Sequence, residues 1–358
     1  MQIRRIDKAR DFMALSPLWS KLTCESGQLS PFLSYDWFWC CWHGVWPRCR
    51  PEILVIEDAG IPVSIVPLMH WRERLSGLPM RCLGFLEYPA APMVDLLTIT
   101  EHDQVLKTLL DHLASRADWD VICFQKLPAT SPTAKALELN LADHLSWRYA
   151  DSLFSPYLTI EGSWESFYSA SSQTVKTIQE QAQDQLQRAG EISIEEHRLV
   201  DPTSPFFQDV LELMCRSSII DGVASNAPSP RLREFFSELT RRASKNGWLS
   251  LWLLRLNGYA IAMEYQLRSD DKVQALHAHN DPAFRHLFPG HVLTLAILQA
   301  LFEDGGLHEY SSKPAFISDP PWWATVAHEM VHLKLYRPSA YARLLHRLET
   351  VVMLVAKK

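Results

Sequence analysis

The chain has 358 residues, of which 47% are hydrophobic and 21% charged, a composition typical of a folded protein rather than a disordered one. This length favours two domains, because single hydrophobic cores usually stop growing at roughly 250 to 300 residues. The formal net charge of −6 offers no basic field for a phosphate backbone, so nucleic-acid binding is not expected.

The sequence indicates neither a membrane span nor a disulfide framework. No stretch approaches the roughly 18 to 20 apolar residues that a membrane-spanning helix requires. The seven cysteines are odd in number and include no CxxC pair, which argues against disulfides and against a zinc ribbon. We therefore expect a cytoplasmic protein in which most cysteines are small buried side chains.

The first half of the chain predicts a mixed α/β domain. Apolar residues at helical spacing predict helices over residues 11–22 and 35–46, the second within the Trp-rich sequence SYDWFWCCWHGVW. Two β-rich runs, 52–56 and 61–69, flank the turn sequence EDAG and predict a hairpin. A Pro- and Ser-punctuated linker is expected over 127–155. The other elements expected in this half are a strand, a helix and a strand, over residues 80–86, 103–117 and 120–125.

The second half predicts three consecutive antiparallel strands. Residues 249–256 and 259–268 read as strands and meet at Asn257-Gly258, the strongest short hairpin signal that a sequence offers. The turn sequence SDD leads from them into a third strand over residues 272–279. The other elements expected are helices over residues 163–189, 206–217, 230–245, 291–303 and 340–356 and strands over residues 307–311 and 331–336.

This order of strands and helices resembles the GNAT superfamily of N-acyltransferases. More closely, the chain is similar to the CelD/BcsL type associated with cellulose and exopolysaccharide biosynthesis, which is related to the Fem aminoacyltransferases with two GNAT-like halves. The resemblance rests on the segments SYDWFWCCW, IPVSIVPL, GSWESFYSASSQTVKTIQEQ, GWLSLWLLRLNGYAIAMEYQLR, HNDPAFRHLFPGHVLTLAILQAL and GLHEYSS, in that order. It implies an α/β fold with mixed sheets: two tandem GNAT-like domains, over 1–150 and 151–338, and a C-terminal amphipathic helix over 339–358.

The loop FRHLFPG, before the helix expected at residue 291, has the features of an anion site. Glycine at a helix start lets a ligand approach the backbone, and the free N–H groups and the helix dipole there favour a phosphate. Arg285 adds a cation that can bind phosphate in a bidentate manner. The alternative is an ordinary helix start with glycine as its N-cap.

In the superfamily this loop binds the pyrophosphate of acyl-coenzyme A. The resemblance therefore implies a cofactor site formed by Arg285, Phe288, Pro289, Gly290 and His291. The expected donor is acetyl-coenzyme A or a longer acyl-coenzyme A, with an acyl carrier protein as a further possibility, and no metal is expected.

Acyl transfer to an amine needs a base to remove a proton and an acid to protonate the leaving thiolate. Glu264 interrupts the apolar strand AIAMEYQL, and a dry site would raise its pKa, so it is the first candidate base. His277 and His279, two apart and hence on one face of a strand, are the alternates. Tyr310 is the candidate acid. Purely structural roles for these side chains remain the alternative.

The candidate substrate contacts are Trp37, Tyr265 and Lys313. Trp37 belongs to an aromatic helix stripe that is either core or a flat wall for a sugar or acyl chain. Ser311-Ser312 stands where relatives often have an acidic residue, which puts their polar constellation in doubt. Residues 171–187 carry Gln and Glu where relatives carry Arg and Lys, which makes a transfer-RNA-dependent activity less expected.

One motif points to a different chemistry. His328-Glu329-Met330-Val331-His332 matches HExxH, in which a helix presents both histidines to zinc. The segment SDPPWWATV before it and the strand-like VHLKLY at its end favour a chance match over a zinc hydrolase, and Glu349 is the only acidic residue downstream.

The sequence thus predicts an acyl-coenzyme A-dependent N-acyltransferase that transfers directly to a small amine, an amino acid or an amino sugar. We expect the N-terminal half to be a degenerate copy that shapes the acceptor pocket. The basic, amphipathic C-terminal helix is expected to dock on the body or on a partner chain, or to contact a membrane surface. The main alternative is a non-catalytic scaffold protein of polysaccharide biosynthesis that keeps the fold.

Overall fold

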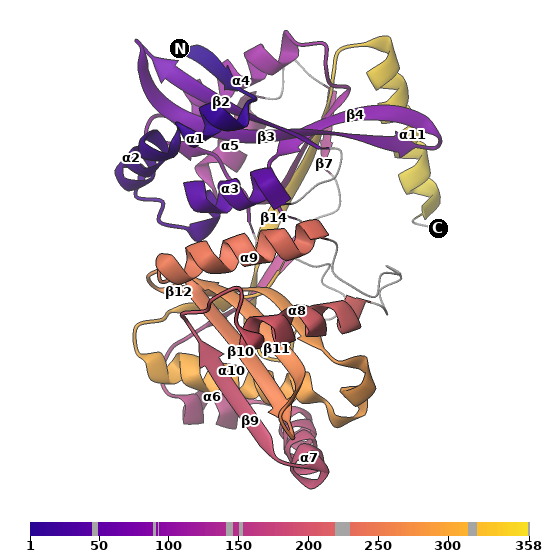
Figure 1. Ribbon diagram of the computed structural model, residues 1–358. Coiled ribbons are helices and arrows are strands. Elements are labelled where there is room, and N and C mark those ends of the chain that lie inside the picture. The colour runs from indigo at the N-terminus through magenta and orange to yellow at the C-terminus, as the bar shows by residue number, and fades with distance from the viewer. Residues whose placement is uncertain are drawn as a thin grey trace. The chain divides into compact units, whose positions relative to one another are not determined.

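Figure 1 shows a computed structural model of the chain, which describes residues 1–44, 49–88, 91, 93–140, 146–149, 153–218, 230–313 and 321–356. The chain divides into two compact units. Of the described residues, those up to 154 and from 328 onward form unit 1, and those at 155–313 and 321–327 form unit 2.

Unit 1 is built on a sheet with the strand order β1-β2-β3-β4-β6-β14, in which β5 pairs with β3 and β7 pairs with β14. All of its pairs are antiparallel except β4 with β6, the two strands that α4 connects. Its strands are β1 (Gln2–Ile6), β2 (Arg50–Asp58), β3 (Ile61–Leu75), β4 (Leu78–Phe85), β5 (Leu97–Thr98), β6 (Val121–Pro128), β7 (Ser146–Tyr149) and β14 (Val326–Tyr336).

The helices of unit 1 are α1 (Ala9–Met13), α2 (Ser16–Ser26), the 3-10 helix η1 (Pro31–Leu33), α3 (Tyr35–Gly44), α4 (His102–Ala114), α5 (Pro132–Asn140) and α11 (Ala340–Ala356). Helix α4 forms because leucines and a valine recur at i, i+3 and i+4, and this stripe packs with α5 on β2, β4 and β6. A second cluster places Ala342 and Leu345 of α11 against Cys82 and Tyr336 of the sheet.

Unit 2 repeats the pattern with a sheet of strand order β8-β13-β12-β11-β10-β9. Its pairs are antiparallel except β12 with β13, the two strands that α10 connects. Its strands are β8 (Leu153–Thr159), β9 (Ile192–His197), β10 (Leu249–Leu256), β11 (Tyr259–Arg268), β12 (Lys272–Asn280) and β13 (Glu309–Ser311). Its helices are α6 (Trp164–Ala170), α7 (Gln173–Ala189), α8 (Pro205–Ser218), α9 (Pro230–Lys245), the 3-10 helix η2 (Pro282–Leu287) and α10 (Pro289–Asp304).

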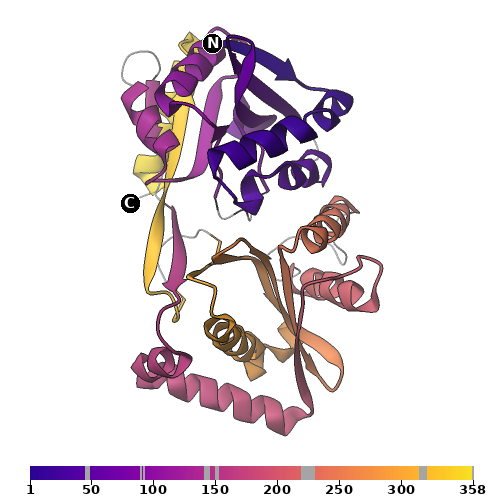
Figure 2. The same ribbon diagram turned by 90° about the vertical axis from the view of Figure 1, so that its left-hand side faces the viewer.

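Helices cover both faces of the unit 2 sheet. Helix α10 lies on one face, backed by α6 and α7, and α8 and α9 lie on the other, as Figure 2 shows with α10 seen nearly end-on. The α10 side holds a large apolar core that includes Trp252, Val273, Ile297 and Tyr310. A residue on the central strands therefore faces either α10 or the α8–α9 pair, according to its place in the strand alternation.

The predicted fold class is confirmed. Each unit has three antiparallel strands, then a helix, then a strand parallel to the third. Strands β10, β11 and β12 end within a residue of the predicted bounds, and the hairpin turn places Asn257 (φ 51°) and Gly258 (φ 78°) in the left-handed region that such turns require.

Other expectations need correction. The expected linker over 127–155 contains α5 and β7, and the single helix expected over 163–189 is broken at Ser171, where Ser172 caps α7 through Val175 N. Strand β14, placed in the second domain, pairs with β6 in unit 1, and α11 packs in the same unit rather than as a separate segment. Among the described helices, none combines the length and the apolar character needed to cross a membrane.

Candidate active site

Strands β12 and β13 separate soon after they meet. They pair in parallel over three residues only, from Lys272–Glu309 to Gln274–Ser311. Beyond this point β12 continues along β11 to Asn280, and no described strand pairs with its other edge. The chain then turns through η2 into α10, so the separated part of β12 leads directly to the N-terminus of that helix.

His277 and His279 lie on this separated part of β12 and share one face. Their partners across β11 are Tyr265 and Met263, so both rings lie on the α8–α9 side of the sheet. His277 Nδ1 is 3.1 Å from His279 Nε2, and His279 Nδ1 is 2.9 Å from Ser217 Oγ at the end of α8. The three side chains form a hydrogen-bonded chain along which a proton can move.

The environment of His277 keeps its imidazole neutral. Burial, followed by His279 and then by Lys313, lowers the pKa of His277 to about 3. The exposed Lys313, two residues after β13, therefore acts on the histidine pair from across the separation of the strands. His277 is therefore unprotonated near neutral pH and has a ring nitrogen that can accept, but a pKa this low makes it a weak base on its own.

Glu264 lies on the opposite face of the same sheet. Its cross-strand neighbours are Ala278 and Trp252, and its Oε1 accepts hydrogen bonds from the Tyr310 hydroxyl at 2.6 Å and from the Gln266 amide at 2.8 Å. Burial raises the pKa of Glu264, while these two hydrogen bonds oppose the rise. Burial and the neighbouring Glu264 also raise the pKa of Tyr310 well above its usual value.

The structure thus does not assemble the four predicted catalytic residues into one constellation. Glu264 and Tyr310 are 4% and 2% exposed in the core under α10, whereas His277 and His279 are partly exposed on the other side. The reason is the period of a strand: Glu264 pairs with Ala278, which lies between the two histidines and points the opposite way.

Two of the predicted substrate contacts are core residues. Tyr265 is fully buried, and its hydroxyl lies 3.1 Å from Thr240 Oγ1 of α9. Trp37 is 2% exposed in unit 1 and packs edge-on against Phe32 with ring centroids 4.8 Å apart. The helically spaced aromatic stripe that includes Trp37 is therefore part of the core. Lys313 is the one predicted substrate contact that is exposed.

The start of α10 has the features of an anion site. Phe288, at φ 50° and 46% exposed, leads into Pro289 at the first position of the helix. Among the described residues, no acceptor is found for the Gly290 N–H, and no ion pair or hydrogen bond is found for the guanidinium of the exposed Arg285 on η2. Backbone donors at a helix start and an unengaged guanidinium suit a phosphate group.

Gly290 has a further reason to be glycine. A Cβ at this position would lie 2.7 Å from the side-chain amide of Asn280, the last residue of β12. The glycine therefore lets the end of β12 pack directly against the start of α10. His291, the next residue, is partly buried, which lowers its pKa, and its ring lies edge-on to Phe288.

Two features of the site were not predicted. Ser217 and Asn280 contact the histidine pair and Gly290, and a hydroxyl or an amide in a polar segment carries no distinguishing signal in the sequence. Asp281 is 3% exposed, caps η2 through Ala283 N and pairs with Arg216 Nε at 2.7 Å. Its position before Pro282 is the one sequence signal for such a cap.

The zinc hydrolase reading is wrong. His328, Glu329 and His332 lie on strand β14, not on a helix. Four residues along a strand separate the two histidine Cα atoms by about 13 Å, which is too far for both rings to bind one ion.

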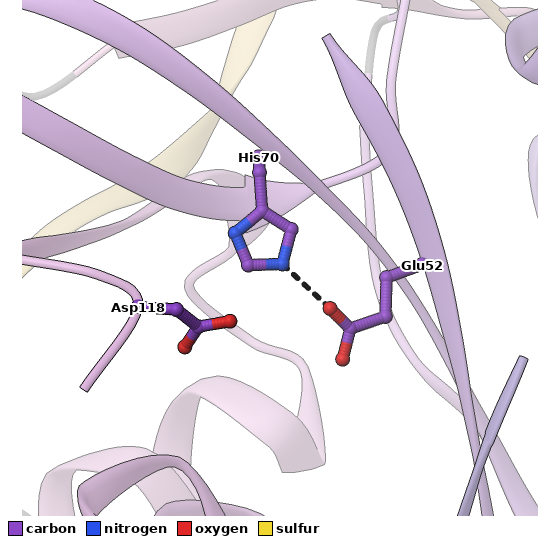
Figure 3. Close-up of side chains that lie close together, drawn as sticks. All are labelled: Glu52, His70 and Asp118. Atoms are coloured by element: carbon purple, nitrogen blue, oxygen red, sulfur yellow. Dashed lines mark hydrogen bonds and ion pairs between the residues drawn. The ribbon is translucent and has the colours of Figure 1, made fainter. Parts of the chain in front are cut away.

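A polar cluster in unit 1 also resembles a metal site (Figure 3). Glu52, His70 and Asp118 have ligand-type atoms within 4.8 Å of one another, and Glu52 Oε2 lies 2.5 Å from His70 Nε2. However, Arg116 already donates to both oxygens of Glu52, at 2.6 and 2.9 Å, and to Asp118 at 2.7 Å. A guanidinium satisfies these carboxylates, so the cluster is an ion-pair network rather than a cation site.

Comparisons with known proteins agree with this fold. A family model described as acetyltransferase (GNAT) domain matches residues 173–313. FemX matches with 12% identity and a TM-score of 0.57, over 97% of this chain and 99% of that one. The tandem GNAT protein from the clavulanic acid biosynthesis pathway matches with 11% identity and a TM-score of 0.52, over 94% and 100%.

L-PGS from Bacillus licheniformis matches with 8% identity and a TM-score of 0.52, over 98% of each chain. No curated protein sequence matches this one. At such identities structural likeness shows the fold alone. Residues 173–313 in unit 2 are therefore similar to a GNAT acetyltransferase domain, and the chain has the fold of tandem GNAT proteins.

Proposed function

We propose that unit 2 transfers an acyl group from a coenzyme A thioester to the amine of a small molecule. The observation that carries this proposal is the separation of β12 from β13 directly before the N-terminus of α10. One continuous stretch of chain therefore carries an anion site, a base, and a strand edge that has no described partner. A domain that merely retained the fold would not need an unengaged arginine or a histidine relay at this place.

The donor would be held at its phosphate end. The Gly290 N–H at the start of α10, the helix dipole and the guanidinium of Arg285 offer hydrogen bonds and positive potential to a pyrophosphate. Phe288 and His291 flank this position. The thioester would then lie along the unpaired edge of β12, near the histidines.

The reaction needs two proton transfers, because the attacking amine loses a proton and the leaving thiolate gains one. As the amine nitrogen bonds to the carbonyl carbon, it loses a proton to the His277–His279 pair, which Ser217 orients. The carbon–sulfur bond then breaks and the thiolate leaves, taking a proton from the histidine pair or from water. Lys313 is placed to stabilise negative charge near His277.

Direct transfer is supported by the state of the only cysteine that the sequence places in unit 2. Cys215 is 9% exposed, and its thiol donates to Leu211 O. Burial raises the pKa of this thiol, which disfavours the nucleophilic thiolate. An acyl-enzyme on cysteine is therefore not part of the proposal.

The acceptor and the setting follow from the resemblance and the surface. We propose an amino sugar, amino acid or other small amine as the acceptor, and the CelD/BcsL resemblance supports a place in exopolysaccharide biosynthesis. Seven free cysteines support a reducing compartment such as the cytoplasm. Helix α11 exposes Leu344, Val351 and Val352, which supports contact with a membrane surface or a partner.

Mass spectrometry of products from acetyl- and longer acyl-coenzyme A with a panel of amines tests the proposal. We expect one amine class to be acylated, with turnover falling roughly 100-fold or more in His277→Asn/His279→Asn. His308→Asn, an exposed histidine in the same unit, is the matched control and should keep full activity. Absence of acylation with every donor and amine would favour the non-catalytic scaffold.

A further inference from the structure

Unit 1 contains a cavity of about 280 Å³ at the place that corresponds to the active site of unit 2. Here β4 and β6 pair in parallel over three residues only, Cys82–Gly84 with Val121–Cys123, and then separate. The cavity lies at this separation, with walls from β3, from β4 and the residues after it, and from β6. The second separation of strands was not predicted to form a site.

The buried part of the cavity carries one charge of each sign, and the second carboxylate of the lining, Glu73, is exposed. Lys126 Nζ lies 3.2 Å from Glu87 Oε2, and the two residues are 7% and 9% exposed. Burying an ion pair rarely stabilises a fold, because desolvation offsets the attraction. A buried pair that borders a cavity instead presents a positive and a negative pole, side by side, to whatever fills the space.

The backbone is shaped to aim Lys126 at this place. Its φ is 57°, in the left-handed region that lysine rarely adopts. Between the pairs Phe124–Leu333 and Leu127–Val331, two residues of β6 face one residue of β14, which is a β-bulge. Val94 N donates to Lys126 O at 3.0 Å and fixes the bulged residue. Strain and bulges of this kind concentrate where a side chain is re-aimed for binding.

Besides Cys49, Glu73, Cys123 and Gln125, the rest of the lining is apolar and is also held in place. Met69, Trp71 and Phe85 provide this surface. The Trp71 ring can lie against the sheet because residue 84 is glycine: a Cβ there would be 2.9 Å from the ring and 2.5 Å from the Cys123 carbonyl oxygen. Glu73, which is exposed and accepts from Trp71 Nε1 at 2.7 Å, connects the lining to the solvent.

We propose that this cavity binds a small zwitterion with an apolar side group, such as an α-amino acid, with its carboxylate at Lys126 and its ammonium at Glu87. Because Lys126 and Glu87 already balance each other, a ligand with a single charge would add an uncompensated charge to this buried site, whereas a zwitterion keeps the site neutral. A cavity of about 150 Å³ accommodates benzene, so this one has room for leucine or phenylalanine.

The test is thermal-shift and calorimetric titration of the full chain with leucine and phenylalanine, in the absence of any acyl donor. At least one should bind and raise the melting temperature. For phenylalanine, the one-ended analogues phenethylamine and 3-phenylpropionate should bind at least tenfold more weakly. Failure of both amino acids to bind, or equal binding of the one-ended analogues, overturns the proposal.

The variant Lys126→Met/Glu87→Gln removes both charges at similar volume, which lets the fold persist, and should abolish binding. Lys135→Met/Glu138→Gln, which changes exposed charges on α5, is the matched control and should bind normally. Retained binding in the first variant contradicts the proposal. Arg285→Ala should leave this binding unchanged, so failure here and failure of acyl transfer in unit 2 are told apart.

Discussion

The Tyr310 hydroxyl on β13 lies 2.6 Å from Glu264 Oε1 on β11, so this hydrogen bond spans the intervening strand β12. Both side chains are buried beneath α10. The bond ties β13 to the sheet at the point where its pairing with β12 ends. The Glu264 carboxylate, which interrupts an apolar strand, therefore has a structural contact here, and in the proposed reaction the histidines on the other face handle the proton.

Tyr310→Phe removes the donor and leaves the Glu264 carboxyl without one partner. We expect the free energy of unfolding to fall by about 1–3 kcal/mol, while turnover stays within a few-fold of the parent value. Denaturant titration and steady-state kinetics measure the two quantities. Unchanged stability together with a loss of turnover of roughly 100-fold would instead make Tyr310 the acid.

Glu264→Gln keeps an acceptor for Tyr310 and removes the charge. Because the carboxyl faces the core rather than the histidines, we expect kcat and the KM for the donor to change little. A fall in kcat of roughly 10²- to 10⁴-fold, with unchanged melting temperature, would restore Glu264 as the base.

His277 makes stability depend on pH. Its folded pKa of about 3 lies below the usual value of 6.5, so between these values the unfolded chain binds more protons than the folded chain. Stability is therefore lost as the pH falls from 6.5 toward 3. His277→Asn should flatten the dependence of the unfolding midpoint on pH in this window, and a dependence equal to that of the parent would show that His277 is not held neutral.

Glu52 makes stability depend on pH in a lower pH range. Burial alone would raise its pKa, but hydrogen bonds from His70 and Arg116 lower it to about 2. The stabilisation is thus complete above 4.5 and is lost as the pH falls toward 2. Glu52→Gln should be destabilised at neutral pH and less sensitive to acid, as measured by denaturant titration at several pH values, whereas chelators should have no effect on either protein.

A double substitution distinguishes two roles of Gly290, which are to leave room for the donor phosphate and to leave room for Asn280. Gly290→Ala places a methyl group against the Asn280 amide and close to the Gly290 N–H at the start of α10. We expect the KM for the donor to rise about tenfold both in this variant and in Gly290→Ala/Asn280→Ala, because the methyl group obstructs the phosphate in each. Full recovery in the double variant would mean that the glycine serves only Asn280.

The sequence supported the fold better than the site. Asn257-Gly258 and the strong periodicity around it located β10, β11 and β12 almost to the residue. Strand β9 was missed because its residues are only partly buried, and its place depends on pairing with β10. Helix α5, inside the expected linker, was missed because its apolar pattern is weak, and its place depends on packing against α4.

Whether the site residues could be predicted depended on knowing which side of a strand each side chain faces. Two histidines at i and i+2 were predicted to share a face, and they do. That Glu264 faces away from them follows from the register of β11 against β12, which includes a bulge after Tyr265 and cannot be read from either strand alone. The same limit hid the cavity of unit 1, where Lys126 is aimed by a bulge against β14, about 200 residues later in the chain.

The most direct test of the account is the melting temperature of the full chain with acetyl-coenzyme A, compared with an acetyl thioester of N-acetylcysteamine that lacks the nucleotide and its phosphates. A ligand at about 100 times its Kd adds about 2.7 kcal/mol of stability, so we predict a rise of a few degrees with acetyl-coenzyme A or a longer acyl form. The short thioester should give none, and Arg285→Ala should lose most of the rise while keeping the parent melting temperature without ligand. If no coenzyme A thioester raises the melting temperature, or if Arg285→Ala responds like the parent, the anion site at the start of α10 does not exist.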